Sequence, residues 1–266
     1  MKILFIGDIV GSIGRRIVKE KVPYFVNKYG IDFVIANGEN ATHGKGLIYR
    51  HYEELIDAGV DVITLGNHYD SKNEIERYIS RVDNLIRPCN LLKEFPGDGT
   101  ALFDVDGFAV RVTNILGTAF MREQVNNPYY SLLEIIADEE EKNVIHIVDF
   151  HGEATGEKIG FAKAFDGKVT AVLGTHTHVQ TRDAQILPNG TAFISDVGMC
   201  GQYDGVLGFE SKSVIDKTIF GKDSKFETLN DGRGLFSAVV IEVDEINGLA
   251  KDIFPIYYIE ESNNGN

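Results

Sequence analysis

The sequence has few cysteines, no tryptophan, a shortage of positive charge and no long apolar run. Its two cysteines, Cys89 and Cys200, lie far apart and form no CxxC pair, which disfavours a disulfide and fits a reducing cytoplasm. No apolar stretch approaches the roughly 18–20 residues that a membrane-spanning helix needs. The first residues become polar too soon for a signal peptide. We therefore expect a cytoplasmic protein without a membrane anchor.

The charge balance is strongly acidic. Asp and Glu total 40 against 26 Lys and Arg, which gives a net charge of −14. Such a surface offers no general attraction to nucleic-acid backbones or anionic membranes. It does not exclude a phosphate substrate, because bound divalent metal ions reverse the local potential. We expect a small-molecule partner, and the sequence leaves open whether the chain forms a homo-oligomer.

Several well-known catalytic and binding motifs are missing as well. The chain has no G-x-S-x-G elbow, no H-E-x-x-H pair and no G-x-G-x-x-G fingerprint. Gly11 and Gly14 follow an early glycine but lack the dinucleotide spacing, so we discount that interpretation. Lys45 lies between two glycines and is a candidate phosphate contact, although the P-loop spacing is absent.

Apolar segments alternate with helical patterns over the first ninety residues. Such an order predicts parallel strands joined by right-handed crossovers. Pro23 lies inside the first helical pattern, where we expect a kink or a break. The expected strands cover 2–6, 32–36 and 60–65, and the expected helices cover roughly 13–28, 49–58 and 73–82.

Hairpins are expected in the rest of the chain. Asp106-Gly107 is a strong turn signal between the apolar segments 101–105 and 108–112. Two further turns, at 188–190 and 247–248, each separate a pair of apolar segments. The remaining strands are expected at 144–148, 171–173, 186–187, 191–194, 235–243 and 253–259.

One further helix is expected before the second group of strands. It begins at Pro128 with Asn127 as its cap and ends in the acidic run 138–141, which we interpret as a solvated end. Parallel units followed by hairpins predict an α/β fold, a four-layer α/β/β/α sandwich of two mixed sheets. We expect a single domain over 1–266, with 260–266 as a frayed polar tail.

Short polar clusters stand at the ends of five apolar segments. In open α/β sheets, ligands bind outside the carboxyl ends of the strands. The clusters therefore predict one site, and their Asp, Glu, Asn and His side chains suit a centre of two metal ions. They are Gly7-Asp8, Gly38-Glu39-Asn40, Gly66-Asn67-His68, His151-Gly152-Glu153 and His176-Thr177-His178.

The first two clusters each allow a second interpretation. Asp8 can point into the crevice, or it can cap the helix that follows, and the residue alone does not decide. Glu39 and Asn40 are harder to explain as a polar turn, since an acid beside an amide at a strand end needs partners. A carboxylate can bridge two cations about 3.5–4 Å apart, and an asparagine adds a neutral oxygen. We favour metal ligation by this pair.

Histidine supplies the sharpest local signal. His176 and His178 are two residues apart, so on an extended strand both rings face one cavity. We favour metal ligation over a chance pairing. His68 in isolation is as readily structural as functional. In context Asn67 offers an oxygen ligand, and His68 has an unperturbed pKa near neutrality that suits a general acid.

The cluster after 144–148 has one predicted ligand, His151. Asp149 precedes it by two residues and would orient its ring. Glu153 could be a ligand, a support for a ligand or an acid at a helix start, and we favour the last two. Imidazole nitrogens suit iron, zinc and related metals, while carboxylates add oxygen donors that manganese also accepts.

Three histidines lie outside this set. His43 is a loop residue and a candidate substrate contact, although a plain loop position is the commoner interpretation. His51 is expected on a helix surface. His146 lies within a predicted strand and is expected to be a packed core residue.

In chain order the clusters resemble the blocks of the calcineurin-like metallophosphoesterases: D-x-H, an acid, G-N-H, a single histidine and H-x-H. Val10 stands where the first block has its histidine, and Glu39-Asn40 replaces the usual aspartate. These departures, together with 149–155, 174–181 and 196–199, are similar to one branch, the bacterial YmdB-like proteins. The similarity runs along the whole chain.

The resemblance implies a metallophosphoesterase-like fold and a ligand set for two divalent metal ions. Iron or manganese is the family metal, and zinc or magnesium is the alternative. Glu39 would bridge the two ions. The other ligands would be Asp8, Asn40 and His178 for the first ion, and Asn67, His151 and His176 for the second.

The resemblance also implies the reaction. The substrates would be cyclic nucleotides, chiefly 2′,3′-cyclic ones opened at the 2′ bond. Hydroxide activated by the metal ions would attack phosphorus, and His68 would protonate the departing ribose oxygen. A phosphomonoesterase or a protein phosphatase on the same centre is the main alternative. Another is a regulatory metal-binding protein that acts through partners.

A few positions depart from the family pattern. Tyr69-Asp70 stands where the family usually has a Trp-Asp pair nearby, and this chain has no tryptophan. Gly156 replaces a common serine, and Cys200 a common threonine. None is a proposed ligand, so these departures bear on substrate preference more than on catalysis.

Overall fold

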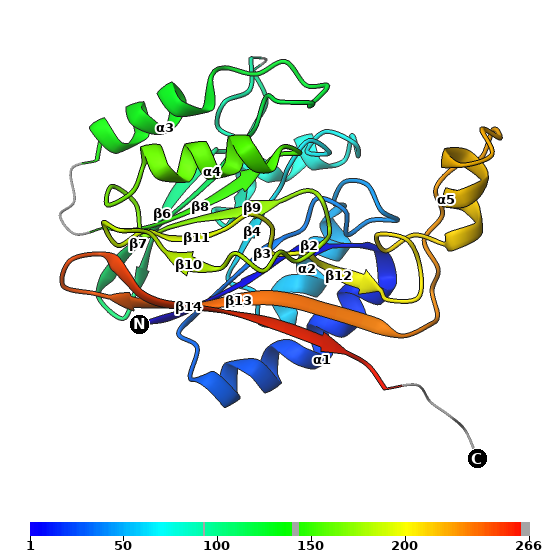
Figure 1. Ribbon diagram of the computed structural model, residues 1–266, viewed down its shortest axis with the longest axis horizontal. Coiled ribbons are helices and arrows are strands. Elements are labelled where there is room, and N and C mark those ends of the chain that lie inside the picture. The colour runs from blue at the N-terminus through cyan, green and yellow to red at the C-terminus, as the bar shows by residue number, and fades with distance from the viewer. Residues whose placement is uncertain (93, 140–143, 262–266) are drawn as a thin grey trace.

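Two mixed β-sheets pack face to face, and helices cover their outer faces (Figure 1). The computed structural model describes residues 1–92, 94–139 and 144–261. The expected four-layer α/β/β/α sandwich is confirmed. Among the described helices we find none that combines the length and the apolar character of a membrane span.

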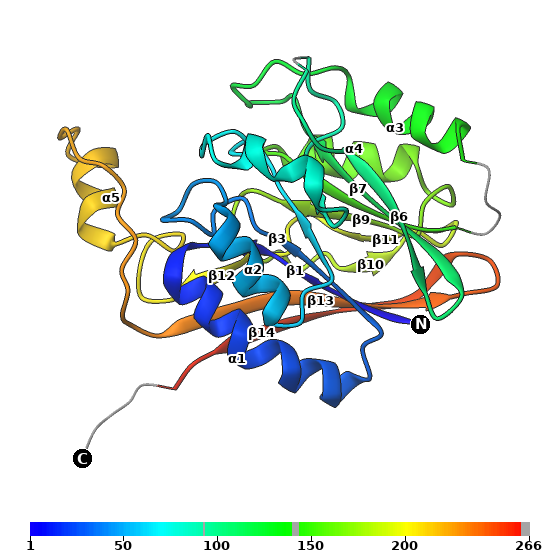
Figure 2. The same cartoon turned by 180° about the vertical axis from the view of Figure 1, so that it is seen from behind.

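The first sheet has the strand order β2-β12-β13-β1-β3-β4-β5, with β14 paired to β13. β1, β3, β4 and β5 are parallel, and β13 runs antiparallel to β1. Helices α1 (Gly11–Tyr29) and α2 (Tyr49–Asp57) cover its outer face (Figure 2). The strands are β1 (Lys2–Ile6), β2 (Asp8–Ile9), β3 (Phe33–Asn37), β4 (Val62–Thr64), β5 (Leu85–Ile86), β12 (Met199–Gln202), β13 (Gly234–Asp244) and β14 (Leu249–Ile259).

The second sheet has the strand order β10-β11-β9-β8-β7-β6. Its four central strands are parallel, and the edge strands β6 and β10 are antiparallel to their neighbours. Helices α3 (Pro128–Ala137) and α4 (Thr155–Ala164) lie on its outer face (Figure 1). The strands are β6 (Thr100–Val105), β7 (Phe108–Leu116), β8 (Ile145–His151), β9 (Ala171–Thr175), β10 (Gln185–Ile186) and β11 (Ala192–Ile194).

Strand β1 shows why the apolar runs are continuous. Successive side chains of a strand point to opposite faces of its sheet. Ile3 and Phe5 pack between the two sheets, whereas Leu4 and Ile6 pack under the helices. Both faces are buried, so the strand carries no polar alternation. The carboxyl ends of such strands are the first places where polar side chains can reach solvent.

Of the kink or break expected at Pro23, the break does not occur, because helix α1 continues through this residue. Pro23 lies on the exposed face, while Val22 and Phe25 on either side of it are buried in the core. Packing of the apolar face holds the helix despite the backbone hydrogen bond that proline cannot donate.

The helix expected over 73–82 is wrong. The segment forms two 3-10 turns, Ile75–Arg77 and Ile79–Arg81, separated by Tyr78 at φ −125°. Ile75, Tyr78 and Ile79 have helical spacing and are all buried in the core under α2. The Tyr78 hydroxyl also donates to the Leu47 carbonyl at 2.9 Å. Two short turns therefore bury the same apolar residues that a helix would bury.

Three further expectations need correction or fall outside the described residues. The acidic run after α3 is not simply solvated, because the Glu139 carboxylate accepts a hydrogen bond from Arg111 Nε; Glu140 and Glu141 lie outside the described residues. The frayed tail expected from 260 onward does not include Glu260, because its carboxylate accepts two hydrogen bonds from the Arg16 guanidinium. Residues 262–266 lie outside the described residues. His51 is buried, with Nδ1 2.9 Å from Thr42 Oγ1, and burial lowers its pKa to about 4.

Acidification should destabilise the fold through His146, which is a packed core residue as expected. Its side chain is 5% exposed, its Nε2 lies 2.8 Å from Thr113 Oγ1, and burial lowers its pKa from 6.5 to about 3. Between these two values the unfolded chain binds a proton that the folded chain does not. The free energy of unfolding should therefore fall by roughly 2 kcal/mol between pH 6.5 and 4.5.

Urea unfolding of wild type and His146→Gln at these two pH values measures this contribution. The variant should lose less stability on acidification than the wild type. His43→Gln, at an exposed loop position, is the matched control. An identical pH slope for wild type and His146→Gln would contradict the prediction.

Candidate metal centre

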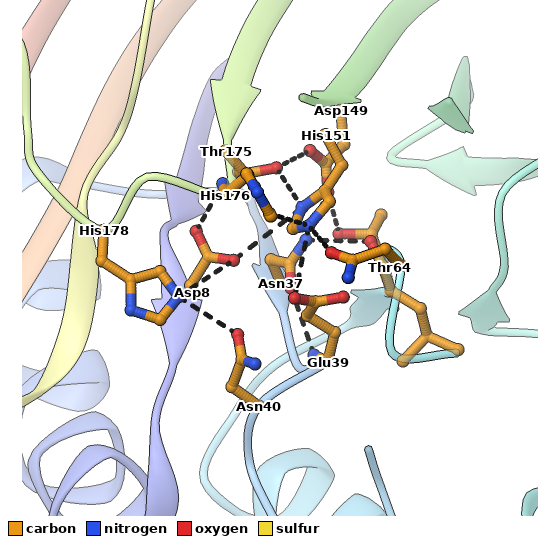
Figure 3. A network of polar contacts seen from close by, with 12 residues as sticks. Asp8, Asn37, Glu39, Asn40, Thr64, Asp149, His151, Thr175, His176 and His178 are labelled. Carbon is orange, nitrogen blue, oxygen red and sulfur yellow. Dashed lines mark hydrogen bonds and ion pairs between the residues drawn. The ribbon is translucent and has the colours of Figure 1, made fainter. Parts of the chain in front are cut away.

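Four of the five polar clusters meet at one end of the two sheets (Figure 3), and the Gly66-Asn67-His68 cluster joins them through Asn67, whose Oδ1 lies 3.0 Å from His151 Nε2. Asp8, Glu39 and Asn40 follow strands of the first sheet, whereas His151, His176 and His178 come from the second sheet. Each follows or ends an apolar strand, so the carboxyl ends of both sheets contribute to one site. The convergence that the sequence pattern predicts is therefore present in the structure.

The orientation of His151 is set by a chain of hydrogen bonds. Thr175 Oγ1 donates to Asp149 Oδ1 at 2.6 Å, and it therefore accepts from His151 Nδ1 at 2.9 Å. Asp149 is itself held by Asn37 Nδ2 at 2.9 Å and by Thr64 Oγ1. Asp149 thus orients His151 as expected, but through Thr175 rather than directly. The network assigns the proton to Nδ1 and leaves a lone pair on Nε2.

That lone pair of His151 faces other electron-pair donors. Nε2 lies 3.0 Å from Asn67 Oδ1, 3.2 Å from Glu39 Oε1 and 3.0 Å from His176 Nδ1. The donor atoms of Glu39, His151 and His176 all lie within 4.8 Å of one another. Lone pairs this close repel unless a proton or a cation lies between them, so the arrangement suits a metal ion.

The other two histidines are oriented in the same manner. His176 Nε2 lies 3.2 Å from Glu153 Oε2, which leaves Nδ1 facing His151. His178 Nδ1 donates to the Leu207 carbonyl at 3.0 Å, which leaves Nε2 facing inward. Each of the three histidines therefore has one nitrogen bound to an acceptor outside the cluster and the other free to bind a metal.

A second group of donor atoms surrounds His178. Its Nε2 lies 3.3 Å from Asn40 Oδ1 and 3.9 Å from Asp8 Oδ1. Asn40 is oriented by its amide, which donates to the Gly44 carbonyl at 3.1 Å. Asp8 Oδ2 accepts from the His176 N–H at 3.1 Å, but Oδ1 is buried and has no hydrogen-bond partner among the described residues. An orphaned buried carboxylate oxygen needs a cation.

Gly66 leaves room for this arrangement. A Cβ at this position would collide with the Glu39 carboxylate and the His151 ring. The glycine of the Gly66-Asn67-His68 cluster thus lets β4 and its following turn approach the donor atoms closely. The donor set, the orphaned Asp8 oxygen and this clearance all fit divalent metal ions.

The electrostatics of the site lead to the same conclusion. Burial raises the pKa of Asp8 to about 6, although His178 and His151 act against it. Burial alone would lower the pKa of His151, but the Glu39 and Asp8 carboxylates raise it to about 9. Burial also opposes the charge on Glu39, yet His151 and the His68 N–H hold its pKa below the usual range. The buried carboxylates thus favour positive charge among them, which a divalent cation would supply.

The spacing of His176 and His178 predicts that both lie on an extended strand, and this prediction is wrong. They follow β9 with φ values of 103° and 65°, in the left-handed region. The turn between them is fixed by Asp196 Oδ2, which accepts from Thr177 N at 3.0 Å and from Thr177 Oγ1 at 2.8 Å. The surrounding structure holds a strained backbone here, as is common at functional sites.

Lys158 on α4 supports this turn from inside the protein. Its side chain is fully buried, and its Nζ donates to the Thr175 carbonyl at 2.8 Å and to Asp196 Oδ2 at 2.9 Å. Lys158 and Asp196 were not among the predicted site residues. A signal was present for the lysine, because it shares the apolar helical face of Phe161 and Ala162.

Lys158→Met should destabilise the protein by about 3–5 kcal/mol, because it leaves the buried Asp196 carboxylate without its cation. Thermal and urea unfolding measure the loss. Lys163→Met, at an exposed position of the same helix, should change stability little. Adding Asp196→Asn to the Lys158→Met variant should recover part of the loss. A loss below about 1 kcal/mol would show that the pair does not support the fold.

His68 lies at the edge of the metal centre. Its backbone N–H donates to Glu39 Oε2 at 2.9 Å, and burial lowers the pKa of its ring. His68 lines a cavity of about 430 Å³ together with Asn67 and His176. The loop 42–46 contributes Lys45 to the lining, while His43 is exposed, with its ring 6.2 Å from that of His51. His43 as a substrate contact stays a prediction.

The positions that depart from the family pattern have different surroundings. Asp70 lines the cavity beside His68. Tyr69 packs its ring edge against Phe95 at 4.8 Å. Cys200 is buried, with its Sγ donating to the Ser237 carbonyl at 3.6 Å. A Cβ at Gly156 would meet open space. Asp70 is thus the departure placed to contact a substrate.

The similarity of this chain to known proteins covers every residue of the candidate metal centre. The model of the YmdB-like proteins matches residues 4–256. A 2′,3′-cyclic-nucleotide 2′-phosphodiesterase of Bacillus subtilis (strain 168) is 45% identical over 245 residues, 92% of each chain. The structure of a phosphatase from Mycoplasma pneumoniae is similar at a TM-score of 0.92 and 38% identity, covering 98% of this chain and 94% of that one. The NAD nucleotidase of Haemophilus influenzae shares the fold at a TM-score of 0.63 and 12% identity, over 97% of this chain and 56% of its own.

Proposed function

Because the chain belongs to the YmdB-like family, we propose that it is a phosphodiesterase with two metal ions that hydrolyses 2′,3′-cyclic nucleotides at the 2′ bond. The relationship to a phosphodiesterase and to a phosphatase supports phosphoester hydrolysis as the general activity. The name of the Bacillus subtilis relative supports the cyclic substrate. One observation carries the proposal. One ring nitrogen of each of His151, His176 and His178 faces the cluster of buried carboxylate and amide oxygens.

The two groups of donor atoms suggest how the ions would be held. Glu39 Oε1 lies 3.2 Å from His151 Nε2, Glu39 precedes Asn40 in the chain, and its carboxylate would serve both groups. When bound, such ions lower the pKa of water and neutralise charge on the phosphate. The mixture of imidazole nitrogens with carboxylate and amide oxygens suits iron or manganese. The remaining ligands would be Asp8, Asn40 and His178 for the first ion, and Asn67, His151 and His176 for the second.

His68 would act as the general acid. Its ring lies in the cavity beside Asn67 and His176, where the phosphate and its leaving oxygen would lie. Burial lowers the pKa of His68, and Glu39 nearby opposes that effect. A bound phosphate anion would further favour the protonated ring. The proton would pass to the 2′ oxygen of the ribose as the ring of the cyclic phosphate opens.

A substrate panel on one manganese-loaded preparation tests this function. We expect 2′,3′-cyclic AMP to be converted to 3′-AMP, with a kcat/KM well above those for 5′-AMP and a phosphopeptide. Formation of 2′-AMP would show cleavage at the other bond. A higher kcat/KM for 5′-AMP or for the phosphopeptide would instead indicate a phosphomonoesterase or a protein phosphatase.

A further inference from the structure

The cavity beside His68 has one wall that metal binding and proton transfer do not explain. Asn67, His68 and His176 of the predicted site line it, and residues 120–123 form a further part of its wall. Its volume of about 430 Å³ is in the range of sites for small ligands. A nucleotide whose phosphate lies at the metal centre would extend its base toward this second wall.

The wall is a loop held at both ends. At one end the Glu157 carboxylate of α4 accepts from Thr118 N at 2.8 Å and from Ala119 N at 3.1 Å. At the other end Val125 pairs with Leu91, and Asn126 N donates to the Asn90 carbonyl at 2.8 Å. Both ends of the loop are therefore fixed by the fold, and within it Met121 N donates to the Thr118 carbonyl at 3.4 Å.

Phe120 stands out within this loop. Its side chain is 88% exposed, the highest value among the large apolar side chains of the described residues. Its φ of 63° lies in the left-handed region, which is costly for an aromatic residue. The anchors on Glu157 hold the residue just before it, so the fold imposes this conformation. Neither core packing nor a backbone turn that favours phenylalanine accounts for an aromatic ring at this position.

The polar residues of the wall complement a nucleotide. Lys45 and Arg122 bring positive charge to a cavity that would hold a phosphate, and Asp70 and Glu123 offer hydrogen-bond acceptors. Glu123 Oε1 lies 3.5 Å from Asn67 Nδ2, so the loop reaches the metal centre itself. Phe120 and the predicted ligands Asn67 and His176 thus line one cavity.

We propose that Phe120 is the platform on which the nucleobase of the substrate stacks. This inference rests on the proposed function, because it assigns the base-binding part of the same site. Stacking on an aromatic ring accepts any base but is stronger for the larger purines. The loop would then set the affinity for nucleotides, while the metal centre would act on the phosphate.

Steady-state kinetics of Phe120→Ala test the proposal. We expect KM for 2′,3′-cyclic AMP to rise roughly 5- to 100-fold with little change in kcat, and a smaller rise for 2′,3′-cyclic UMP. Phe120→Trp should retain the wild-type KM. Inhibition by inorganic phosphate, which has no base, should be unchanged. Phe220→Ala is the matched control, since Phe220 is also exposed but follows α5 (Ser211–Thr218), which stands apart from the layers (Figure 1).

Two results for Phe120→Ala would overturn the proposal. One is an unchanged KM for 2′,3′-cyclic AMP. The other is inhibition by phosphate that weakens as much as KM rises, which would show that the loop acts on the metal centre. Absence of turnover in the wild type would refute the proposed function instead. In that case the affinity for 3′-AMP, measured by calorimetry, tests whether Phe120 binds the base. Weaker binding of 3′-AMP to Phe120→Ala, with unchanged binding of phosphate, supports the platform, and equal binding of 3′-AMP excludes it.

Discussion

Replacing Glu39 with glutamine should release bound metal and lower phosphodiesterase activity by at least roughly 10⁴-fold. The side chain is almost fully buried, with Oε1 3.2 Å from His151 Nε2 and Oε2 accepting from the His68 N–H. Glutamine keeps the size but removes the negative charge that both metal ions would share in the proposed centre. Two ions supply several kcal/mol of transition-state stabilisation, and each 1.36 kcal/mol is a factor of ten in rate.

Metal analysis of the purified variant, together with kcat/KM for 2′,3′-cyclic AMP, measures both effects. Glu20→Gln removes a charge from an exposed position on α1 and should leave both unchanged. Two ions per chain in Glu39→Gln would show that Glu39 does not bridge them. Loss of metal with unchanged activity would remove the metal centre from the mechanism altogether.

The fold follows from local patterns wherever packing and local preference agree. The strands buried on both faces, the turn at Asp106-Gly107 and the cap at Asn127 are all visible in the sequence, and each is confirmed. The errors come from tertiary packing. Burial of Val22 and Phe25 keeps α1 intact through Pro23, and residues 75–81 bury their apolar side chains in two 3-10 turns without forming an α-helix.

In the candidate site, too, local sequence predicts some features and tertiary contacts decide the others. Polar residues at strand ends suffice to predict which segments converge, because the carboxyl ends of parallel strands share one edge of a sheet. The groups that orient them are harder to predict. Thr175 is the last residue of β9 and carries no typical metal-ligand side chain, yet it links Asp149 to His151. The left-handed backbone of His176 and His178 depends on Asp196, whose pairing with Lys158 crosses from one element to another.

Replacing His68 with alanine should lower kcat for 2′,3′-cyclic AMP by about 10²–10⁴-fold while both metal ions remain bound. The contact of His68 with the metal centre is made by its backbone N–H, which donates to Glu39 Oε2 and survives the substitution. Only the imidazole ring of this cavity-lining residue is lost. Metal retention thus separates this variant from Glu39→Gln, which should lose metal.

The leaving group distinguishes proton donation by His68 from a structural role. A ribose 2′ oxygen is a poor leaving group that needs a proton, whereas a nitrophenolate leaves without one. His68→Ala should therefore hydrolyse a p-nitrophenyl phosphodiester at nearly the wild-type rate while it fails on 2′,3′-cyclic AMP. An equal loss on both substrates would mean that the ring positions the phosphate. Because the two variants affect different quantities, metal content for Glu39 and leaving-group dependence for His68, together they separate metal activation from acid catalysis within one site.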